Sequence, residues 1–373
     1  MSELVMPVLA MLVLVLGEAC ILQLTGRQKV DWREVIFNLN SGHIMLWLFR
    51  CLEVLCYSLV LTYCSLHLLD SWPEVWLWLF ALLAWDFGFY WLHRLHHRFA
   101  LLWAVHVVHH QGEHFNLSLG VRNSWYSSLT SIPFFIVLAV LGVPLSVFLT
   151  VSILHYSMQL FNHNALTPKL GWLEKILVTP AHHRVHHIND RRYADRNYGG
   201  TFIFWDKLFG TFAQAPATEN IVYGVKGLPP STNPLRESNV PVLRLLGISV
   251  MQPGKVQRFP CSVWLLLTGA LLLFALVAGY IHRYGYEINT VSLEQGILFL
   301  LLAVGSVALG GISDGQRWGA MSWCLVTWLL PLLFLGLWGW LQPFWCISML
   351  AMAVHGLVTM GCCGLRGRSD ESV

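Results

Sequence analysis

The histidines of this chain gather in three short boxes. The chain has 17 histidines, and eight of them stand in these boxes. The first box is a pair four residues apart, and the other two boxes share the pattern H-x-x-H-H: His93 and His97; His106, His109 and His110; His183, His186 and His187. Residues three or four apart share one face of a helix, so each box is able to present its imidazoles to one metal ion. The three boxes therefore predict a metal centre.

The number of imidazoles indicates two metal ions. A catalytic zinc takes about three protein ligands and a structural zinc about four, fewer than the boxes supply. Imidazole suits iron, copper, zinc and nickel. A pair of irons is the simplest prediction, because such a centre binds and splits O2 and then oxidises a C–H bond. Hydrolysis by zinc is the rival chemistry, but the sequence has no H-E-x-x-H motif.

Acidic residues close to the boxes are candidates for holding the ligands. Each imidazole that binds a metal needs its second nitrogen held by another group. We expect Asp86 to do this for the first box, because an idle carboxylate inside an apolar run is costly. Glu113 is the corresponding candidate for the second box. Asp190 and Asp195 flank the third box, and we expect them to pair with arginines in solvent: Arg191, Arg192 or Arg196.

Other histidines lie outside the boxes. His163 lies at the end of an apolar segment that returns to the predicted metal level, so we expect it to be a further ligand. His155 lies two turns deeper, and we expect it to be structural. His282 and His355 stand alone in the last third of the chain and are also predicted to be structural.

The composition predicts an all-α integral membrane protein. Of the 373 residues, 56% are hydrophobic and only 12% are charged, whereas a soluble domain is about a quarter charged. The net charge of +3 and the lack of a basic patch interleaved with aromatic residues exclude a nucleic acid as partner. The nine cysteines are scattered, so neither a disulfide framework nor an iron–sulfur cluster is expected.

Apolar runs predict several membrane spans. We expect single spans at Val5–Leu24, His43–Leu69, Glu74–Trp91, Val263–Ile281, Leu293–Gly311, Met321–Trp340 and Phe344–Met360. Proline and glycine break the run Ile132–His155, which we expect to form a hairpin of two half-spans. Arg50 and Glu53 lie three apart and are expected to pair within the bundle. The basic loops place the histidine boxes and the C-terminus in the cytoplasm, under the positive-inside rule.

The order of these segments predicts four parts of the chain. Residues 1–72 hold N-terminal spans, 73–215 the catalytic domain, 216–260 a cytoplasmic linker and 261–373 the C-terminal spans. The predicted architecture is a polytopic membrane frame with a cytoplasmic, histidine-rich di-metal cap. The membrane would be a bacterial inner membrane, or the endoplasmic reticulum in a eukaryote.

Several motifs resemble a known superfamily. DFGFYWLHRLHH, WAVHVVHH, TPAHHRVHH, the NYGG of Asn197–Gly200 and the WDKLFGTF of Trp205–Phe212 are similar to the boxes of fatty acid hydroxylases and sterol desaturases. The resemblance covers about residues 75–215. It implies a non-haem di-iron centre, O2 and a lipid substrate. It also implies nine ligands, namely His93, His97, His106, His109, His110, His163, His183, His186 and His187, and leaves His96 outside the pattern.

The loop EHFNLSLGVRNS and the extra C-terminal spans are similar to the alkylglycerol monooxygenase-like members of that superfamily. Some relatives have a further histidine four residues before the intervening ligand. Here that position is Gln159, which makes Gln159 a candidate catalytic residue together with Asp86 and Glu113. That branch also has an acid where this chain has Arg98, a departure that bears on its use of a reduced pterin and on its ether-lipid substrate.

The sequence thus predicts an oxygenase that hydroxylates a C–H bond of a fatty acyl, sterol or alkylglycerol-type lipid. Its electrons would come from outside, from a ferredoxin, a b-type cytochrome or a reduced pterin, because no haem, dinucleotide or iron–sulfur motif is present. Desaturation at the same site is the alternative outcome. A metal transporter or sensor is the rival from another class, but it would need ionisable residues strung across the spans.

Overall fold

The computed structural model describes residues 2–41, 43–214, 221–227, 231–250, 261–285 and 291–364. Its elements are helices, with one isolated antiparallel bridge between Leu177 and Phe202 among the described residues. The predicted all-α fold is therefore confirmed. The chain forms two compact units. We call residues Val15–Val30 and Leu48–Pro229 the histidine unit, and residues Met1–Leu14, Asp31–Trp47 and Pro230–Val373 the C-terminal unit.

Seven stretches of described helix are long and apolar enough to cross a membrane, which supports the multi-pass prediction: Val5–Thr25, Trp32–Cys64, Glu74–Arg98, Val263–Tyr284, Leu293–Ser313, Arg317–Leu337 and Pro343–Cys362. The span predicted to end at Leu69 stops at Cys64. There the chain turns, because His67 takes a left-handed backbone (φ 54°) and the Leu66 amide donates to the Val140 carbonyl.

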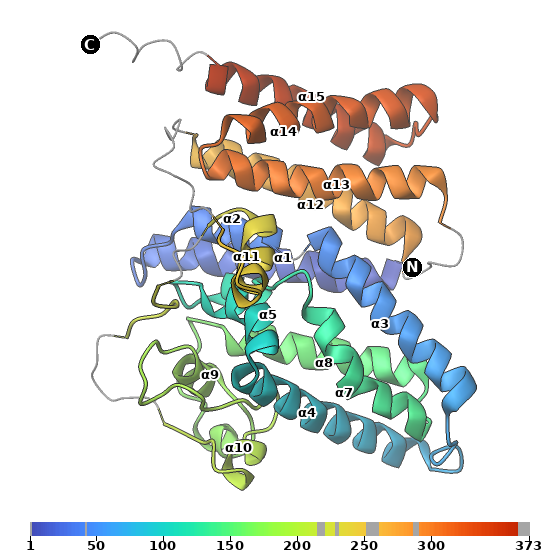
Figure 1. The fold of residues 1–373 in the computed structure, drawn as a ribbon, viewed down its shortest axis with the longest axis vertical. Helices are drawn as coiled ribbons and strands as arrows, with labels where there is room; N and C mark the ends of the chain where they lie inside the picture. Colours follow the sequence, from blue (N-terminus) through green and yellow to red (C-terminus); the bar gives the residue numbers. More distant parts are fainter. Residues whose placement is uncertain are drawn as a thin grey trace. The chain divides into compact units, whose positions relative to one another are not determined.

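The helices that position the site follow one another through the histidine unit (Figure 1): α1 (Ser2–Thr25, in part), α3 (His43–Cys64), α4 (Glu74–Arg98), α5 (Ala100–His110), α6 (Leu117–Val121), α7 (Ser127–Leu141), α8 (Leu145–Asn162), the 3-10 turn Gly171–Lys175, α9 (Pro180–His186) and α10 (Phe204–Leu208). The predicted hairpin is present as α7 and α8. Gly142 ends α7 at φ 100°, a conformation that only glycine adopts easily, and Pro144 opens α8.

Stacked aromatic rings fill the apolar half of the histidine unit. Trp85 of α4 stacks on Phe135 of α7, and Tyr57 of α3 stacks on Phe148 of α8, each pair with ring centroids 4.0 Å apart. Between helices in a bilayer, such close packing stabilises the bundle without any transfer from water. This core fixes α4 against α7 and α8, so it also sets where the histidines at the end of α4 can lie.

Three buried charged side chains tie the helices of this unit together. Arg50 pairs with Glu53 as predicted, Arg50 also donates to the Ser152 hydroxyl (2.8 Å), and Glu53 accepts from the Ser131 hydroxyl (2.8 Å). Glu18 of α1 is only 4% exposed and accepts from the backbone amides of Leu117 and Ala165. Each carboxylate is thus satisfied by groups from other segments, which offsets the cost of burying it.

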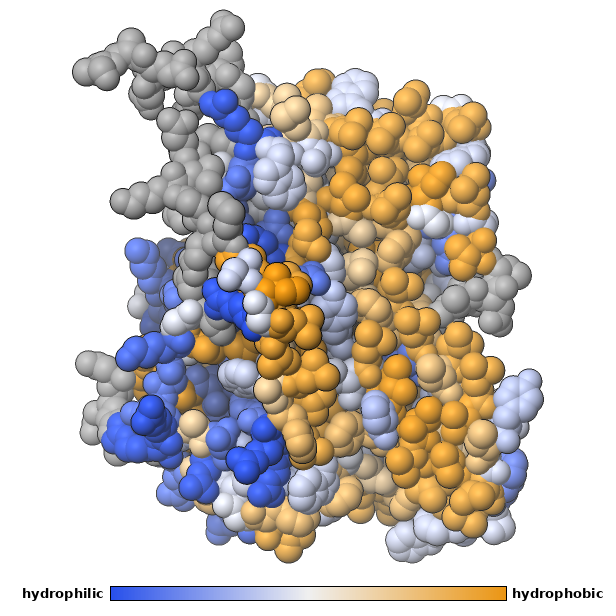
Figure 2. Space-filling model, in the orientation of Figure 1, coloured by the Kyte–Doolittle hydropathy of each residue, from blue (hydrophilic) through white to orange (hydrophobic). Residues whose placement is uncertain are grey.

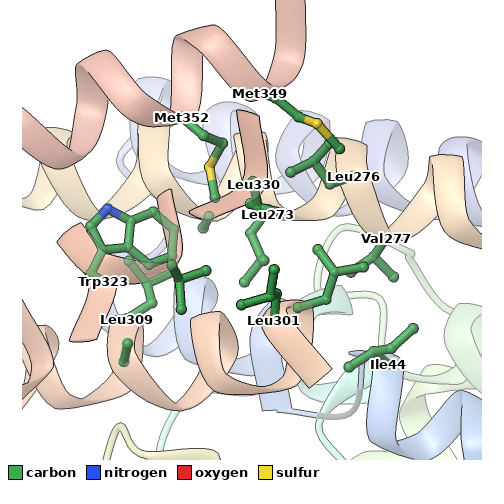
Figure 3. Close-up of a cluster of buried hydrophobic side chains, with 14 of the residues drawn as sticks. Ile44, Leu273, Leu276, Val277, Leu301, Leu309, Trp323, Leu330, Met349 and Met352 are labelled. Atoms are coloured by element: carbon green, nitrogen blue, oxygen red, sulfur yellow. The ribbon is translucent and has the colours of Figure 1, made fainter. Parts of the chain in front are cut away.

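The C-terminal unit is built from α2 (Trp32–Ser41), α11 (Pro234–Leu245), α12 (Val263–Tyr284), α13 (Leu293–Ser313), α14 (Arg317–Leu330), the π-helical turn η2 (Pro331–Leu337) and α15 (Pro343–Gly364). The four segments predicted as C-terminal spans are helical, with ends shifted by a few residues, and each is long and apolar enough to cross a membrane. Figure 3 shows side chains of α12 to α15, such as Leu273, Leu309, Trp323 and Met352, meeting in one apolar core. α13 and α14 approach so closely that a Cβ at Gly319 would lie 2.6 Å from the Gly311 backbone.

His355 is structural, as predicted. Its Nδ1 accepts from the Trp323 indole N–H at 2.9 Å, and its Nε2 lies 2.9 Å from the Leu265 carbonyl. Both ring nitrogens are therefore used within the helix core. His282 is exposed at the end of α12 and lies in neither histidine group described below.

The predicted linker 216–260 contains the ordered helix α11, which Asn233 caps by accepting from the Leu235 amide. Asp314 anchors its start by accepting from the Ser231 and Thr232 hydroxyls. Residues 215–220, 228–230 and 251–260 lie outside the described part of the chain. The boundaries at 72, 215 and 260 stay predictions.

Candidate metal centre

Nine histidines of the histidine unit lie in two groups, each with ligand atoms within 4.8 Å of one another. The first group takes residues from α4, α5 and α9: His93, His97, His106, His110 and His186. The second takes residues from the ends of α5, α8 and α9: His109, His163, His183 and His187. The groups adjoin, since the rings of His110 and His187 stack at 4.5 Å. The structure thus brings together all nine residues expected as ligands.

The sequence explains how each group assembles. His93 and His97 extend α4 beyond its apolar core, and the extended backbone of Phe99 separates α4 from α5 and redirects the chain. The second box then ends α5 and the third box lies on the short helix α9 and its C-cap, where H-x-x-H-H divides its members between the two groups. Neighbours in sequence, such as His109 and His110, serve different groups because their side chains point to different faces of the helix.

The spacing of the ring nitrogens suits bound ions. In the second group, the Nε2 of His163 lies 3.1 Å from that of His183 and 3.2 Å from those of His109 and His187. Ligand nitrogens about 2.1 Å from a metal lie about 3.0–3.4 Å from one another. One shared proton cannot satisfy four nitrogens that face a common point, whereas one cation can.

Burial prepares these imidazoles for metal. His183, His186 and His187 are buried, and burial, followed by the charge of neighbouring histidines, lowers the pKa of each well below its usual value. They are neutral at pH 7 and offer a lone pair. The Nε2 atoms of His93 and His97 are buried without a hydrogen-bond partner in the protein, as expected for atoms that bind a cation.

One segment of four residues holds the second ring nitrogens of three of the five histidines in the first group. We call Asp195–Tyr198 the holding segment. His93 donates from Nδ1 to the Tyr198 carbonyl (2.9 Å), His186 donates from Nδ1 to the Arg196 carbonyl (2.8 Å), and His97 Nδ1 lies 3.4 Å from the Asp195 carboxylate. A nitrogen that donates to a carbonyl carries the proton, which leaves Nε2 free for the metal.

The second group is held from other elements. His109 donates from Nδ1 to the Arg122 carbonyl (3.0 Å), and His163 donates from Nδ1 to the Gln159 carbonyl (2.7 Å). The Arg122 side chain is buried and its Nε donates to the Val108 carbonyl. The two groups therefore depend on different parts of the fold.

Asn197 and Asp206 fix the holding segment. Asn197 is fully buried with φ 54°, and its amide donates to the carbonyls of His182 and Ala213 (2.9 and 2.8 Å) while its oxygen accepts from the Ala213 amide (2.8 Å). The Asp206 carboxylate accepts from the backbone amides of Tyr198 and Gly199, both at 2.8 Å. These contacts give physical roles to the NYGG and WDKLFGTF motifs that the sequence alone did not assign.

The expected contact between Asp86 and the first box is wrong. Asp86 is buried and accepts instead from the backbone amides of Thr201 (2.7 Å) and Phe202 (3.2 Å) and from the Trp205 indole (3.0 Å). The Tyr198 carbonyl already takes the Nδ1 proton of His93. Asp86 therefore does not contact a grouped histidine. It anchors the loop that follows the holding segment.

Of the acids beside the other two boxes, one has the predicted partner and two do not. Glu113 is exposed and lies outside both groups, beside Gly224, while a backbone carbonyl holds His109. Asp190 binds Arg192 at 2.8 Å, as predicted. Asp195 does not pair with an arginine in this way, since its closest ion partner is His97. The hydrogen bond from His97 is the main cause that lowers the pKa of the Asp195 carboxyl.

Two further positions lie close to the ligands. The Gln159 carbonyl holds His163, whereas its side-chain Nε2 is buried beside Gly200 without a hydrogen-bond partner in the protein. His155 pairs through Nδ1 with Asp86 at 3.2 Å and stays outside both groups, in keeping with a structural role. His96 also stays outside, with its Nε2 2.9 Å from the Thr130 hydroxyl.

The part of the chain that holds the two histidine groups is similar to known proteins. The sequence model of the fatty acid hydroxylase family ("Fatty acid hydroxylase") matches residues 78–211. Alkylglycerol monooxygenase of Danio rerio is 40% identical over 205 residues, which are 54% of this chain and 45% of that protein. The human protein of the same name is 41% identical over 177 residues, 48% of this chain and 39% of that protein.

The ornithine lipid hydroxylase OlsE of Rhizobium tropici is 31% identical over 163 residues, 42% of this chain and 48% of that protein. The chain therefore spans less than half the length of these relatives. No solved structure matches it significantly. The matched residues contain all nine grouped histidines, so the similarity to the fatty acid hydroxylase family covers the whole of the candidate metal centre.

Proposed function

We propose that this protein is a membrane oxygenase that uses two irons and O2 to hydroxylate a C–H bond of a lipid. The observation that carries the proposal is the pair of adjoining histidine groups, five imidazoles beside four. The named activities of the relatives, alkylglycerol monooxygenase and ornithine lipid hydroxylase, support a lipid substrate. The balanced reaction is R–H + O2 + 2 e⁻ + 2 H⁺ → R–OH + H2O, so each turnover needs two electrons from a donor.

The ligand set favours iron. All nine grouped side chains are imidazoles, and imidazole is a suitable ligand for iron. Nine ligands are more than the three or four that a single zinc ion takes, so the set fits two ions. Bound iron would supply the redox chemistry that activates O2. The residues of the chain hold the ligands in one tautomer, keep them neutral and shape the space around them.

Aromatic side chains shield the groups. Phe115 is buried with its ring 5.7 Å from that of His163 and 5.6 Å from that of His187, and the Tyr223 ring stacks on Phe115. Trp103 lies 5.1 Å from His97. Such rings exclude water and lower the local dielectric, which suits a reaction on an apolar chain.

The centre belongs on the cytoplasmic side of the membrane under this proposal. Twelve Lys or Arg residues lie between residues 164 and 260, around the third box. Figure 2 shows blue polar residues gathered on one side of the lower part of the view and orange apolar residues over much of the other side. A basic, polar end beside an apolar belt is typical of a cytoplasmic cap on a membrane bundle.

Metal analysis and lipidomics of two matched variants test this function. We expect the purified protein to hold about two irons per chain and His109→Ala to lose activity, because one group of four then has three ligands. His282→Ala is the control, since His282 is an exposed histidine at the end of α12 and lies outside both groups. The lipid product should gain the mass of one oxygen only when O2 is present. An active protein without iron would refute the proposal, and a product lighter by two hydrogens would replace hydroxylation by desaturation.

A further inference from the structure

A cavity of about 470 Å³ lies at the surface of the histidine unit, beside the first group. The end of α4 contributes Trp91, Arg94 and Arg98 to its lining, and the loop that follows α9 contributes Asp195 and Tyr198. Arg98 and Asp195 are exposed, so the cavity is reached from solvent. The metal chemistry described above gives it no role.

Of the nine grouped histidines, only His97 lines this cavity. The His97 Nδ1 faces Asp195 on the cavity wall, whereas its Nε2 is buried and belongs to the first group. One imidazole ring therefore separates the cavity from the metal position. A lipid C–H bond in the cavity would meet the outer edge of that ring and not the metal, so the cavity does not suit the substrate. It suits a donor that passes electrons through His97.

The cavity favours an anionic occupant. Arg94 and Arg98 both line it, and the Arg94 guanidinium is set by the Tyr90 hydroxyl (3.1 Å) and by the ring of Trp91 (5.4 Å to its centroid). Its one carboxylate, Asp195, is already engaged by His97 and by the Tyr198 side chain. Guanidinium groups pair best with carboxylates and phosphates.

The donor has to come from outside this part of the chain. The described cysteines are separate free thiols, so the described residues build no iron–sulfur cluster. We propose that the cavity lined by Arg94 and Arg98 is the docking site of an acidic electron-transfer protein that reduces the centre through His97. This inference rests on the proposed oxygenase function. Each docked carrier loses one electron, so two successive carriers supply the two electrons of one turnover. A reduced pterin, which carries no anionic group, would gain nothing from the guanidiniums.

Stopped-flow reduction of the iron-loaded full-length protein in lipid nanodiscs tests the docking site. The probes are a reduced acidic [2Fe–2S] ferredoxin and reduced methyl viologen, a small cationic donor. For each variant, the measured quantity is the ratio of the ferredoxin rate to the viologen rate. We expect Arg98→Glu to lower this ratio at least ~10-fold at low salt and Arg94→Glu/Arg98→Glu to lower it further, because electrostatic steering raises association rates by about 10–10³-fold. The ferredoxin rate of the unchanged protein should fall steeply with salt.

Arg192→Glu is the matched control, since Arg192 is exposed, lies outside the cavity and is paired with Asp190. It makes the same change in net charge and should leave the ratio near that of the unchanged protein. Arg98→Lys keeps the positive charge, so it should keep most of the ratio that Arg98→Glu loses. Iron content, measured on every variant, shows that the centre is intact.

The inference is overturned if Arg98→Glu leaves the ratio unchanged, if Arg192→Glu lowers it as much, or if only a tetrahydropterin reduces the protein. Failure of the proposed function has a separate signature: no O2-dependent lipid product forms even when methyl viologen supplies the electrons.

Discussion

Replacing Asn197 by glycine should remove one of the two metals and spare the other. The holding segment contacts His93, His97 and His186, which are three of the five imidazoles of the first group, and none of the four in the second group. Glycine keeps the left-handed backbone that Asn197 adopts at φ 54°. The change therefore isolates the side-chain hydrogen bonds from backbone strain.

The size of the effect follows from those bonds. Asn197 makes three of them, two to carbonyls and one from the Ala213 amide. Each is worth about 1 kcal/mol, so the segment loses on the order of 3 kcal/mol of support. Loss of the groups that orient metal ligands typically costs about 10–100-fold in metal affinity. That loss should fall on the first metal alone.

Metal analysis after dialysis against a series of chelator concentrations measures this effect. We expect the unchanged protein to release both irons at similar chelator concentrations, and Asn197→Gly to release one iron at about a 10–100-fold lower concentration. Asp190→Asn is the control, because Asp190 lies on the same loop and its carboxylate pairs with Arg192. Equal loss of both irons, or no loss, would refute the assignment of the holding segment to the first group.

Three further outcomes follow from contacts around the same centre. Gly120→Ala should weaken the second metal selectively, since a Cβ there would lie 2.9 Å from Nδ1 of His163; chelator titration would show the reverse of the Asn197 result. Gly200→Ala should lower the melting temperature with little selectivity between the metals, because its Cβ would overlap the His155 ring and cost about 1–3 kcal/mol. Metal-free protein should lose stability as pH falls below about 6.5, because the third-box histidines are neutral in the folded protein and take up protons when it unfolds. Thermal melts at pH 7.5 and 5.5 measure this loss as a lower melting temperature at pH 5.5. Equal melting temperatures would contradict the prediction.

The sequence predicted the histidines that come together better than the groups that hold them. The i, i+3 and i, i+4 spacing of histidine follows from helix geometry, so the nine candidates could be chosen without coordinates. Their holders are mainly carbonyls, such as those of Tyr198 and Arg122, and every residue has a carbonyl. Side-chain identity therefore could not indicate them. Asp86 is an example. Its position inside an apolar run indicated that it has a partner, but did not indicate which groups it binds.

In the fold, too, some features could be predicted from the sequence and others could not. Apolar runs predicted the long helices, because the length that crosses a bilayer is a property of composition. The turn at His67 and the ordered helix α11 inside the predicted linker depend on tertiary contacts, such as that of Leu66 with Val140 and that of Thr232 with Asp314. Hydropathy does not carry that information. Asn197 gave a weak signal, since asparagine is among the residues that tolerate a left-handed backbone.

Asp195 is the residue for which the sequence was most misleading, and its charge can be tested separately from its position. It is 69% exposed at its side chain, and solvent pairing with an arginine was the natural expectation, yet its carboxylate faces the Nδ1 of His97. A carboxylate on the outer nitrogen makes an imidazole a stronger donor and stabilises the more highly charged, oxidised metal. Asp195→Asn keeps an oxygen in place and removes the charge. We therefore expect the reduction potential of one metal to rise while the iron content stays near that of the unchanged protein. Asp195→Ala, which also removes the oxygen, should lower the iron content as well. A spectroelectrochemical titration in which Asp195→Asn and the unchanged protein coincide would show that Asp195 only shapes the loop.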